Sequence, residues 1–528
     1  MSVNAELGDI RDPMPGTDGE SLEDVSSPRP ETDCSQMSSV APPDGCDIPV
    51  TEPYADSFAE AAEETFIARN RAYLSRMRRF AGVDRAVAYT LMWRGWQILA
   101  GGLTILFIAR FLTATQQGFY YTFNGILGLQ VFFELGLSGV ILQFASHERA
   151  KLTIGQKGQV DGDAIARCRL ASILRTAVGW YAVAACAMVA VVLPVGVWFF
   201  GRQASADSVS WLGPWAGIVL FSGLSLFLAP LLSFLQGLGM VSQVAAAHTL
   251  KAIAASLLLW VGLIAGFGLH ASVLYVGATA LVVLIWLLAK QRVMLRKIVA
   301  DYDPRTTVNW RHEIWPFQWR IAISWLSGYF IWPVINPIVF GLEGPVVAGQ
   351  MGMSMAVLAG VGTMAISWIN TKAPAFGVLV ARKDYRGLDR LFFRSLAQSL
   401  TVAAVLAGVA WAAICYLNHI DSSWAVRVLP PLPFGILALA MGVNHVVFSE
   451  AIYLRAHKRE PFLWPSVMLG ASNVTCAYVL GKAYGVFGII CGYAILCLVI
   501  GLGLGTWIFV TKRREWHQYD PDNLHSDV

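Results

Sequence analysis

Residues 91–112, LMWRGWQILAGGLTILFIARFL, form the first long apolar run of the chain. At a rise of 1.5 Å per residue, a helix of this length matches the hydrocarbon core of a bilayer, which is about 30 Å thick. Arg94 is the fourth residue of the run. A charge at such a position either extends to the lipid head groups or binds a partner inside the protein. The run therefore predicts a membrane-spanning helix with one candidate binding residue.

The composition of the whole chain points to the same class of protein. Of its 528 residues, 56% are hydrophobic and only 14% are charged, which is typical of a polytopic membrane protein. Twelve apolar runs are long enough to cross a bilayer. They lie near 88–112, 119–145, 171–200, 211–235, 240–268, 270–290, 317–342, 345–370, 393–417, 430–454, 463–483 and 485–511. We expect an all-α fold of twelve transmembrane helices.

Basic residues predict how these helices are oriented, because Lys and Arg near span ends mark the cytoplasmic side. With twelve spans, the basic clusters all fall on one side of the membrane, and the opposite loops hold few cations. The clusters contain Arg78, Arg79, Arg85, Arg149, Lys151, Lys157, Arg167, Arg292, Arg296, Lys297, Arg311, Lys372, Arg382, Lys383, Arg386, Arg455, Lys458, Arg459, Lys512, Arg513 and Arg514. Both termini are therefore predicted to be cytoplasmic.

Composition also divides the chain into parts. The first 64 residues hold 16 Asp and Glu but only 2 Lys and Arg, and a segment this polar cannot bury enough apolar area to fold. The predicted parts are a disordered acidic cytoplasmic tail (1–57), an amphipathic basic helix on the cytoplasmic membrane surface (58–86), a lobe of helices 1–6 (87–300), a lobe of helices 7–12 (301–511) and a cytoplasmic tail (512–528).

A weak internal repeat supports the division into two six-helix lobes. Trp93 and Arg94 open the first span, and Trp319 and Arg320 open the seventh. In both places a short polar turn follows, and a span rich in small residues returns. Parallel repeats of this kind are related by an axis along the membrane normal, with the binding site between them.

Three segments carry a family resemblance. They are FLTATQQGFYYTFNGILGLQVFFELGLSGVILQFASHERA (111–150) with its motif Glu134-Leu135-Gly136-Leu137, TKAPAFGVLVARKDYRGLDRLFFRSL (371–396) with Pro374, Lys383, Asp384 and Leu388, and LRAHKREPFLWPSVMLGASNVTCAYVLGKAYGVFGIICGYAI (454–495). In order and spacing they resemble bacterial polysaccharide flippases, the Wzx-type branch of the multidrug/oligosaccharidyl-lipid/polysaccharide exporter superfamily. The segment 329–340, with Pro333 and Pro337, departs from that family's pattern.

The resemblance implies a function. Such a protein moves a polyprenyl-pyrophosphate-linked oligosaccharide from the inner to the outer leaflet of a bacterial inner membrane by alternating access, for surface polysaccharide synthesis. It breaks no bond and is not an enzyme, and it needs no cofactor. The implied partners are the lipid-linked oligosaccharide, membrane lipids and, through the acidic tail, other polysaccharide-assembly proteins. No nucleic acid is expected.

Cations inside or beside the apolar runs are the candidate substrate-binding residues, because charge within a membrane is costly. Arg94, Lys251, Arg320 and Lys372 lie in the predicted cytoplasmic half, where they suit an anionic pyrophosphate. The simpler interpretation of Lys251, Arg320 and Lys372 is an anchor at the membrane boundary.

Glu134, His445 and Glu450 are the candidate ion-coupling residues. Glu134 and Arg94 lie at depths that differ by about 3 Å on two legs of one predicted hairpin, so we expect a salt bridge between them. It either braces the hairpin or acts as a switch. His445 is either a proton-coupling group or a hydrogen-bonded packing residue.

Other functions are weighed against the same residues. An ion-coupled multidrug exporter of the same superfamily should carry acidic cavity residues, for which only Glu134 and Glu450 are candidates. A glycan polymerase or ligase should have a large outer loop, and the predicted outer loops are short. A scaffold that recruits partners through its acidic tail is a further alternative. The chain has no nucleotide-binding loop of the G-x-x-x-x-G-K-[ST] kind.

Overall fold

The computed structural model describes residues 85–155, 160–203, 209–306, 308, 310, 315–457 and 459–518. The predicted acidic tail and nearly all of the predicted surface helix lie outside these residues. The elements are α2 (Arg85–Phe111), α3 (Ala114–Leu127), η1 (Gly128–Gln130), α4 (Val131–Glu134), α5 (Leu137–Arg149), β1 (Leu152–Ile154), β2 (Val160–Gly162), α6 (Ala164–Gly201), α7 (Leu212–Gly237), α8 (Val241–Ile264), α9 (His270–Trp286), η3 (Leu287–Gln291), α10 (Arg292–Ala300), α11 (Trp315–Ile331), α12 (Ile335–Asn370), α13 (Ala373–Ala381), α14 (Tyr385–His419), η5 (Ala425–Arg427), α15 (Pro431–Arg455), α16 (Leu463–Leu496), η6 (Cys497–Leu504) and α17 (Gly505–Gln518).

The described residues confirm the predicted all-α membrane fold. Nine helical segments there are long and apolar enough to cross a membrane, or ten if α3–α4 and α5, bent by 42°, count as one span. Two segments, 325–381 and 463–517, are 57 and 55 residues long, far more than the ~20 residues that one crossing needs. The two short strands β1 and β2 pair antiparallel in a hairpin that the sequence did not predict.

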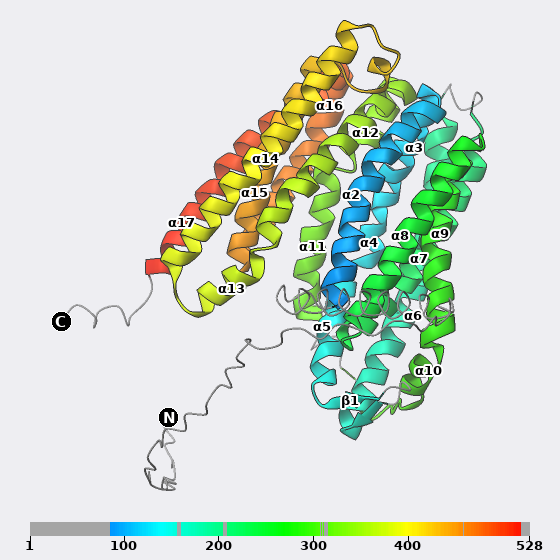
Figure 1. Ribbon diagram of the computed structural model, residues 1–528, viewed down its shortest axis with the longest axis vertical. Helices are drawn as coiled ribbons and strands as arrows, with labels where there is room; N and C mark the ends of the chain where they lie inside the picture. Colours follow the sequence, from blue (N-terminus) through cyan, green and yellow to red (C-terminus); the bar gives the residue numbers. More distant parts are fainter. Residues whose placement is uncertain are drawn as a thin grey trace, which may run out of the picture. The chain divides into compact units, whose positions relative to one another are not determined.

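The helices form two groups, which we call the first half (α2–α10) and the second half (α11–α17). In the first half α2 packs along α8, and α7 packs against α5, α6 and α9. In the second half α14 packs against α12 and α15, and α16 packs against α11. The most extensive contact between the halves joins α3 to α12, which lie side by side in Figure 1.

Two glycines reverse the chain inside helices that are otherwise continuous. Gly344 in α12 has φ 82° and Gly485 in α16 has φ 62°, a region of backbone conformation that glycine enters without steric cost. After Gly485, Gly488 and Gly492 lie against Leu480 and Cys476, which precede it. The two legs of α16 therefore lie side by side.

The reversal at Gly344 is visible from its neighbours. Asn336, before it, donates from Nδ2 to Thr122 Oγ1 at 3.1 Å, and Gly352, after it, packs on Tyr121. Both legs of α12 therefore contact the same turn of α3. Each of the two long apolar segments is thus a hairpin and not a single rod.

The proline-rich segment that departs from the family pattern forms a helix break. α11 ends at Ile331 and α12 begins at Ile335. A residue that precedes proline is disfavoured in the α conformation, which accounts for the end of α11 before Pro333. Pro333 and Pro337 then lie against Gly125 of α3, so the break is part of the contact between the halves.

The predicted second span is broken as well. Leu135 and Gly136 have φ of 51° and 66°, so α4 ends at Glu134 and α5 begins at Leu137. The motif Glu134-Leu135-Gly136-Leu137 is therefore the point at which this span bends. The sequence had predicted one continuous helix here, because apolar periodicity does not report a local break.

Aromatic side chains form the core at the contact between the halves. Phe119 of α3, Phe200 of α6 and Phe340 of α12 are fully buried. The Phe119 ring lies 5.0 Å from Phe340 and 5.4 Å from Phe200 between centroids, the former in an edge-to-face arrangement. Such pairs contribute about 0.5–1.5 kcal/mol each beyond their buried area, so they stabilise the contact between the halves.

Gly118 provides a test of this contact. A Cβ on Gly118 would overlap the backbone carbonyl of Pro345, which cannot move without shifting α12. We expect Gly118→Ala to destabilise the protein by about 1–3 kcal/mol, as overpacking does, and to lower the midpoint of thermal unfolding in detergent. Gly139→Ala in α5, where a Cβ meets open space, is the matched control and should be neutral or slightly stabilising. Equal midpoints for the two variants would contradict the close approach.

Candidate functional site

The packing of α2 on α8 is set by polar contacts of two tryptophans. Trp96 donates from Nε1 to Ser256 Oγ at 3.0 Å, and Trp260 donates from Nε1 to Thr104 Oγ1 at 3.0 Å. Each bond joins one helix to the other, so the pair fixes both the register and the facing sides of the helices.

This register brings two of the predicted substrate-binding residues into one cluster. Trp93 stacks on His248 with 5.0 Å between ring centroids, and the Arg94 guanidinium lies 5.2 Å from the Trp93 ring. Lys251 follows His248 by about one helical turn on α8. We call Trp93, Arg94, His248 and Lys251 the α2–α8 cation cluster.

The cluster has unused binding capacity. Within the described part of the chain, neither Arg94 nor Lys251 forms an ion pair, and His248 Nδ1 is buried without a hydrogen-bond partner. A buried polar atom without a partner costs free energy unless a ligand or water satisfies it. The arrangement can therefore hold an anion that offers several acceptor oxygens.

The predicted salt bridge between Arg94 and Glu134 is wrong for this structure. Glu134 Oε1 instead accepts a hydrogen bond from Ser138 Oγ at 2.7 Å, and Ser138 Oγ lies 2.9 Å from Tyr181 Oη of α6. Arg94 is exposed. The two residues have similar depths, but α2 packs along α8 and not along α4, so they do not face each other.

The other two ion-coupling candidates, both on α15, have separate surroundings. Ser399 donates its hydroxyl to Ala365 O at 2.6 Å and so accepts from His445 Nε2, also at 2.6 Å. Glu450, 4% exposed, accepts from Thr506 Oγ1 of α17 at 3.0 Å. The structure does not bring His445 and Glu450 together, and it gives each an internal partner.

No described contact joins the remaining two predicted cations to the α2–α8 cation cluster. Lys372 is exposed at the junction of α12 and α13. Arg320 lies on α11, but its side chain is outside the described residues. The structure therefore assigns neither of them a contact with the cluster.

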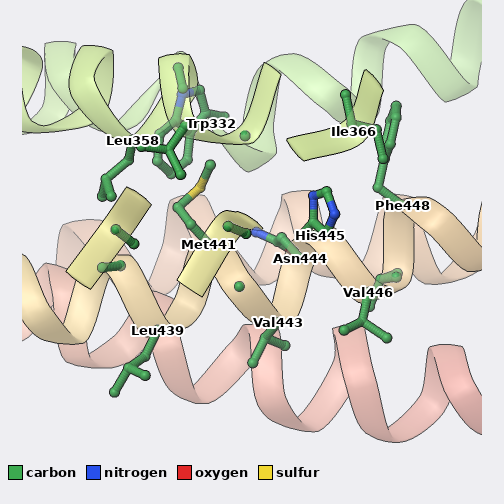
Figure 2. A pocket seen from close by; sticks show the side chains of 18 of the residues that line it. Trp332, Leu358, Ile366, Leu439, Met441, Val443, Asn444, His445, Val446 and Phe448 are labelled. Carbon is green, nitrogen blue, oxygen red and sulfur yellow. The ribbon is translucent and has the colours of Figure 1, made fainter. Parts of the chain in front are cut away.

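A large cavity in the second half was not predicted from the sequence. It has a volume of about 1340 Å³ and is lined by α11, α12, α14, α15, α16 and η6. Figure 2 shows Trp332 and Leu358 on one side and Met441, Asn444 and His445 on the other. Among the described lining residues the one charged side chain is Arg455, and none is acidic. No local pattern signals this cavity, because it arises between helices distant in sequence.

Gln117 is a second feature that the sequence reasoning missed. It is 1% exposed, and its Nε2 donates to Gly349 O and to Arg427 O, both at 2.8 Å. Gln350 Nε2 also donates to Val426 O at 3.0 Å. These bonds tie the start of α3 to α12 and to the loop before α15. The buried amide thus joins the two halves at one end of the bundle.

An ion pair at the other end of the second half was also missed. Arg513 of α17 donates from Nε to Asp389 Oδ1 of α14 at 2.9 Å, and Tyr453 Oη of α15 donates to the same oxygen at 2.7 Å. Three helices therefore meet at one carboxylate. Asp389 lies in the second segment that carries the family resemblance, where its interaction with α17 leaves no local sequence signal.

Comparisons with known proteins concern the fold. No family model and no curated protein matches the sequence, but solved structures do. A multidrug resistance MATE transporter of the MOP superfamily, in an inward-facing conformation, is 14% identical over 80% of this chain and 99% of its own, with a TM-score of 0.51. The MATE multidrug transporter DinF-BH is 12% identical over 83% and 97%, with a TM-score of 0.53.

A Vibrio cholerae MATE transporter is 14% identical over 82% of this chain and 96% of its own, with a TM-score of 0.50. At this level of identity the likeness concerns the fold alone. It spans nearly the full length of each of these three transporters. The chain therefore has the multi-pass membrane fold of MATE transporters of the MOP superfamily.

Proposed function

We propose that this protein translocates a polyprenyl-pyrophosphate-linked oligosaccharide from the inner to the outer leaflet of a bacterial inner membrane, for surface polysaccharide synthesis. The observation that carries the proposal is the charge of the candidate site. Arg94 and Lys251 stand on facing helices without a carboxylate partner in the described chain, and the described cavity lining contains no acid.

The α2–α8 cation cluster suits a pyrophosphate for a physical reason. Charge-assisted hydrogen bonds to phosphate oxygens are short and strong, and a cation within a membrane requires such a partner. Arg94 and Lys251 donate to the phosphate oxygens, and His248 donates from Nδ1 when that atom carries the proton. The cargo's lipid tail stays in an apolar environment throughout, so the protein lowers the cost of moving the polar head alone.

The second candidate function is export of drugs, which the fold of the multidrug MATE transporters favours. A cationic drug requires accessible carboxylates. Glu134 and Glu450 each accept a hydrogen bond from a neighbouring hydroxyl, and neither is among the described residues that line the cavity. The charge of the site therefore favours an anionic cargo.

We also propose how the chain crosses the membrane. When the bent α3–α5 pair counts as one span and each of the two long hairpin segments as two, the chain crosses the membrane twelve times, in two six-helix lobes with both termini cytoplasmic. The start of α3 and the loop before α15 then lie at the periplasmic side. There the Gln117 contacts close the path between the halves.

Transport by alternating access follows from this arrangement. Opening toward the periplasm requires the bonds from Gln117 to Gly349 O and Arg427 O to break. A cargo shifts this equilibrium only by as much as it binds the two conformations differently. Glu134, at the bend of its span, and His445 and Glu450, on α15, remain the proposed residues for ion coupling, and Arg320 and Lys372 the proposed further cations for the head group.

Removing the cluster cations tests the cargo. In a host that lacks the gene, lipid-linked intermediates should accumulate and wild-type protein should clear them. Arg94→Ala and Lys251→Ala should each reduce surface glycan about tenfold or more, since a charged hydrogen bond is worth about 1.5–3 kcal/mol, and Arg94→Lys should retain part of the activity. Lys297→Ala, at an exposed position of α10, is the matched control.

The proposal fails if the gene's deletion causes no accumulation and leaves surface glycan unchanged. A drug exporter would instead show wild-type glycan in both alanine variants, together with increased sensitivity of the deletion host to lipophilic cations. The two functions therefore give opposite results in one set of strains.

Replacing Gln117 tests the proposed closure at the periplasmic side. In a variant without native cysteines, Met355→Cys places a thiol on α12 at a position that is 7% exposed. Gln117→Leu removes the hydrogen bonds to Gly349 O and Arg427 O, worth about 1 kcal/mol each. Labelling of this thiol by an impermeant maleimide, added to whole cells, should therefore rise about tenfold or more. Asn124→Leu removes a bond only to Tyr120 O within α3 and should leave labelling unchanged. Equal labelling in both variants would contradict the closure.

A further inference from the structure

The cavity of the second half is long and narrow. Its lining residues follow α15 from Leu432 to Arg455, a rise of about 35 Å at 1.5 Å per residue, close to the thickness of a bilayer's hydrocarbon core. Spread over this length, the volume of about 1340 Å³ corresponds to a mean cross-section on the order of 40 Å². This form suits an extended chain better than a compact ring system.

Most of the polar side chains in the lining already have a protein partner. Asn444 and Tyr493 bind each other, His445 binds Ser399, Trp411 Nε1 donates to Pro431 O, Thr363 Oγ1 donates to Ala359 O, and Arg455 binds Glu460. A sugar or a polar drug needs free donors and acceptors to replace its lost water. Each of these six side chains already uses part of its hydrogen-bonding capacity within the protein, and the rest of the described lining is almost wholly apolar. The ligand that fits is a hydrocarbon.

Glycines keep part of this space open. A Cβ on Gly328, Gly408 or Gly442 would meet no atom within 4 Å, and all three line the cavity. They lie on α11, α14 and α15, which form its walls. This differs from Gly118, where the glycine permits a close backbone contact. At the three lining positions the missing side chains leave room that a ligand can occupy.

We infer that this cavity holds the hydrocarbon tail of the transported lipid while the α2–α8 cation cluster holds its pyrophosphate. The inference rests on the proposed function and adds a second binding site to it. α12 forms one wall of the cavity and also packs against α2, the helix that carries Arg94. An anionic head and an apolar tail match the cation cluster and the cavity in charge and polarity.

Binding of the tail in this cavity depends mainly on the shape of the tail and adds little to the affinity for the whole lipid. A tail that leaves the bilayer for the cavity exchanges one apolar environment for another, so no water is released and packing alone decides. Filling the cavity should therefore weaken binding of a long-chain substrate moderately and leave head-group binding unchanged.

The experiment uses the full chain in lipid nanodiscs and two probes. One is a long-chain polyprenyl diphosphate with a photoreactive diazirine near the tail end, and the other is a short-chain prenyl diphosphate. We expect the diazirine to crosslink to α14 and α15, and an excess of phosphatidic acid not to compete. Gly442→Leu and Gly408→Leu should weaken long-chain binding about fivefold and leave short-chain binding unchanged, which also shows that both variants fold. Gly377→Leu, on α13 where a Cβ meets open space, should bind both probes as the wild type does.

Other outcomes overturn the inference. If both probes bind but the crosslinks fall outside the cavity, or if the two filled variants bind the long chain as the wild type does, the tail lies elsewhere and the proposed function stands. Full competition by phosphatidic acid would assign the cavity to ordinary bilayer lipid. If the wild type binds neither probe, the proposed function fails and the inference fails with it.

Discussion

The close contact between α3 and α12 is the interaction on which the rest of this structure depends. Gly118 and Gly349 allow the two backbones to approach, and Pro345 fills the space that a side chain on Gly118 would occupy. Small residues serve this purpose in membranes, where close van der Waals packing replaces the hydrophobic effect. The Phe119–Phe340 contact and the bonds of Gln117 both require this approach, so the position of the second half relative to the first follows from it.

The reversal at Gly344 and the break before Pro333 shape α12 for this contact. Because the chain turns back at Gly344, both legs of the hairpin can lie on α3, and the proline-rich leg contacts Gly125. In the span that begins with α3, the bend at Leu135 and Gly136 directs α5 toward α6 and α7. A non-glycine residue at positive φ is strained, and here Leu135 is held beside the Glu134–Ser138 hydrogen bond.

Charge and apolar surface are divided between the halves. The first half presents Arg94 and Lys251 around a tryptophan–histidine stack, whereas the lining of the cavity in the second half is mostly apolar. An amphiphilic cargo requires both environments. The likeness to multidrug transporters does not decide the cargo, because one fold supports many functions and the site determines which.

The sequence by itself determined the class of this protein, and the tertiary structure decided its sites. Apolar runs of bilayer length identify membrane helices. The turn at Gly344 falls between two predicted spans, and the turn at Gly485 falls on the first residue of the last one, because length and local conformation are properties of neighbouring residues. Depth along a hairpin also follows from the sequence, but the side that a helix presents to its neighbours does not. For that reason the predicted Arg94–Glu134 salt bridge is wrong. Arg94 and Lys251 instead lie beside Trp93 and His248, and no sequence pattern showed that these two rings stack between the helices. The Gln117 contacts and the cavity along α15 arise only when helices far apart in sequence pack together.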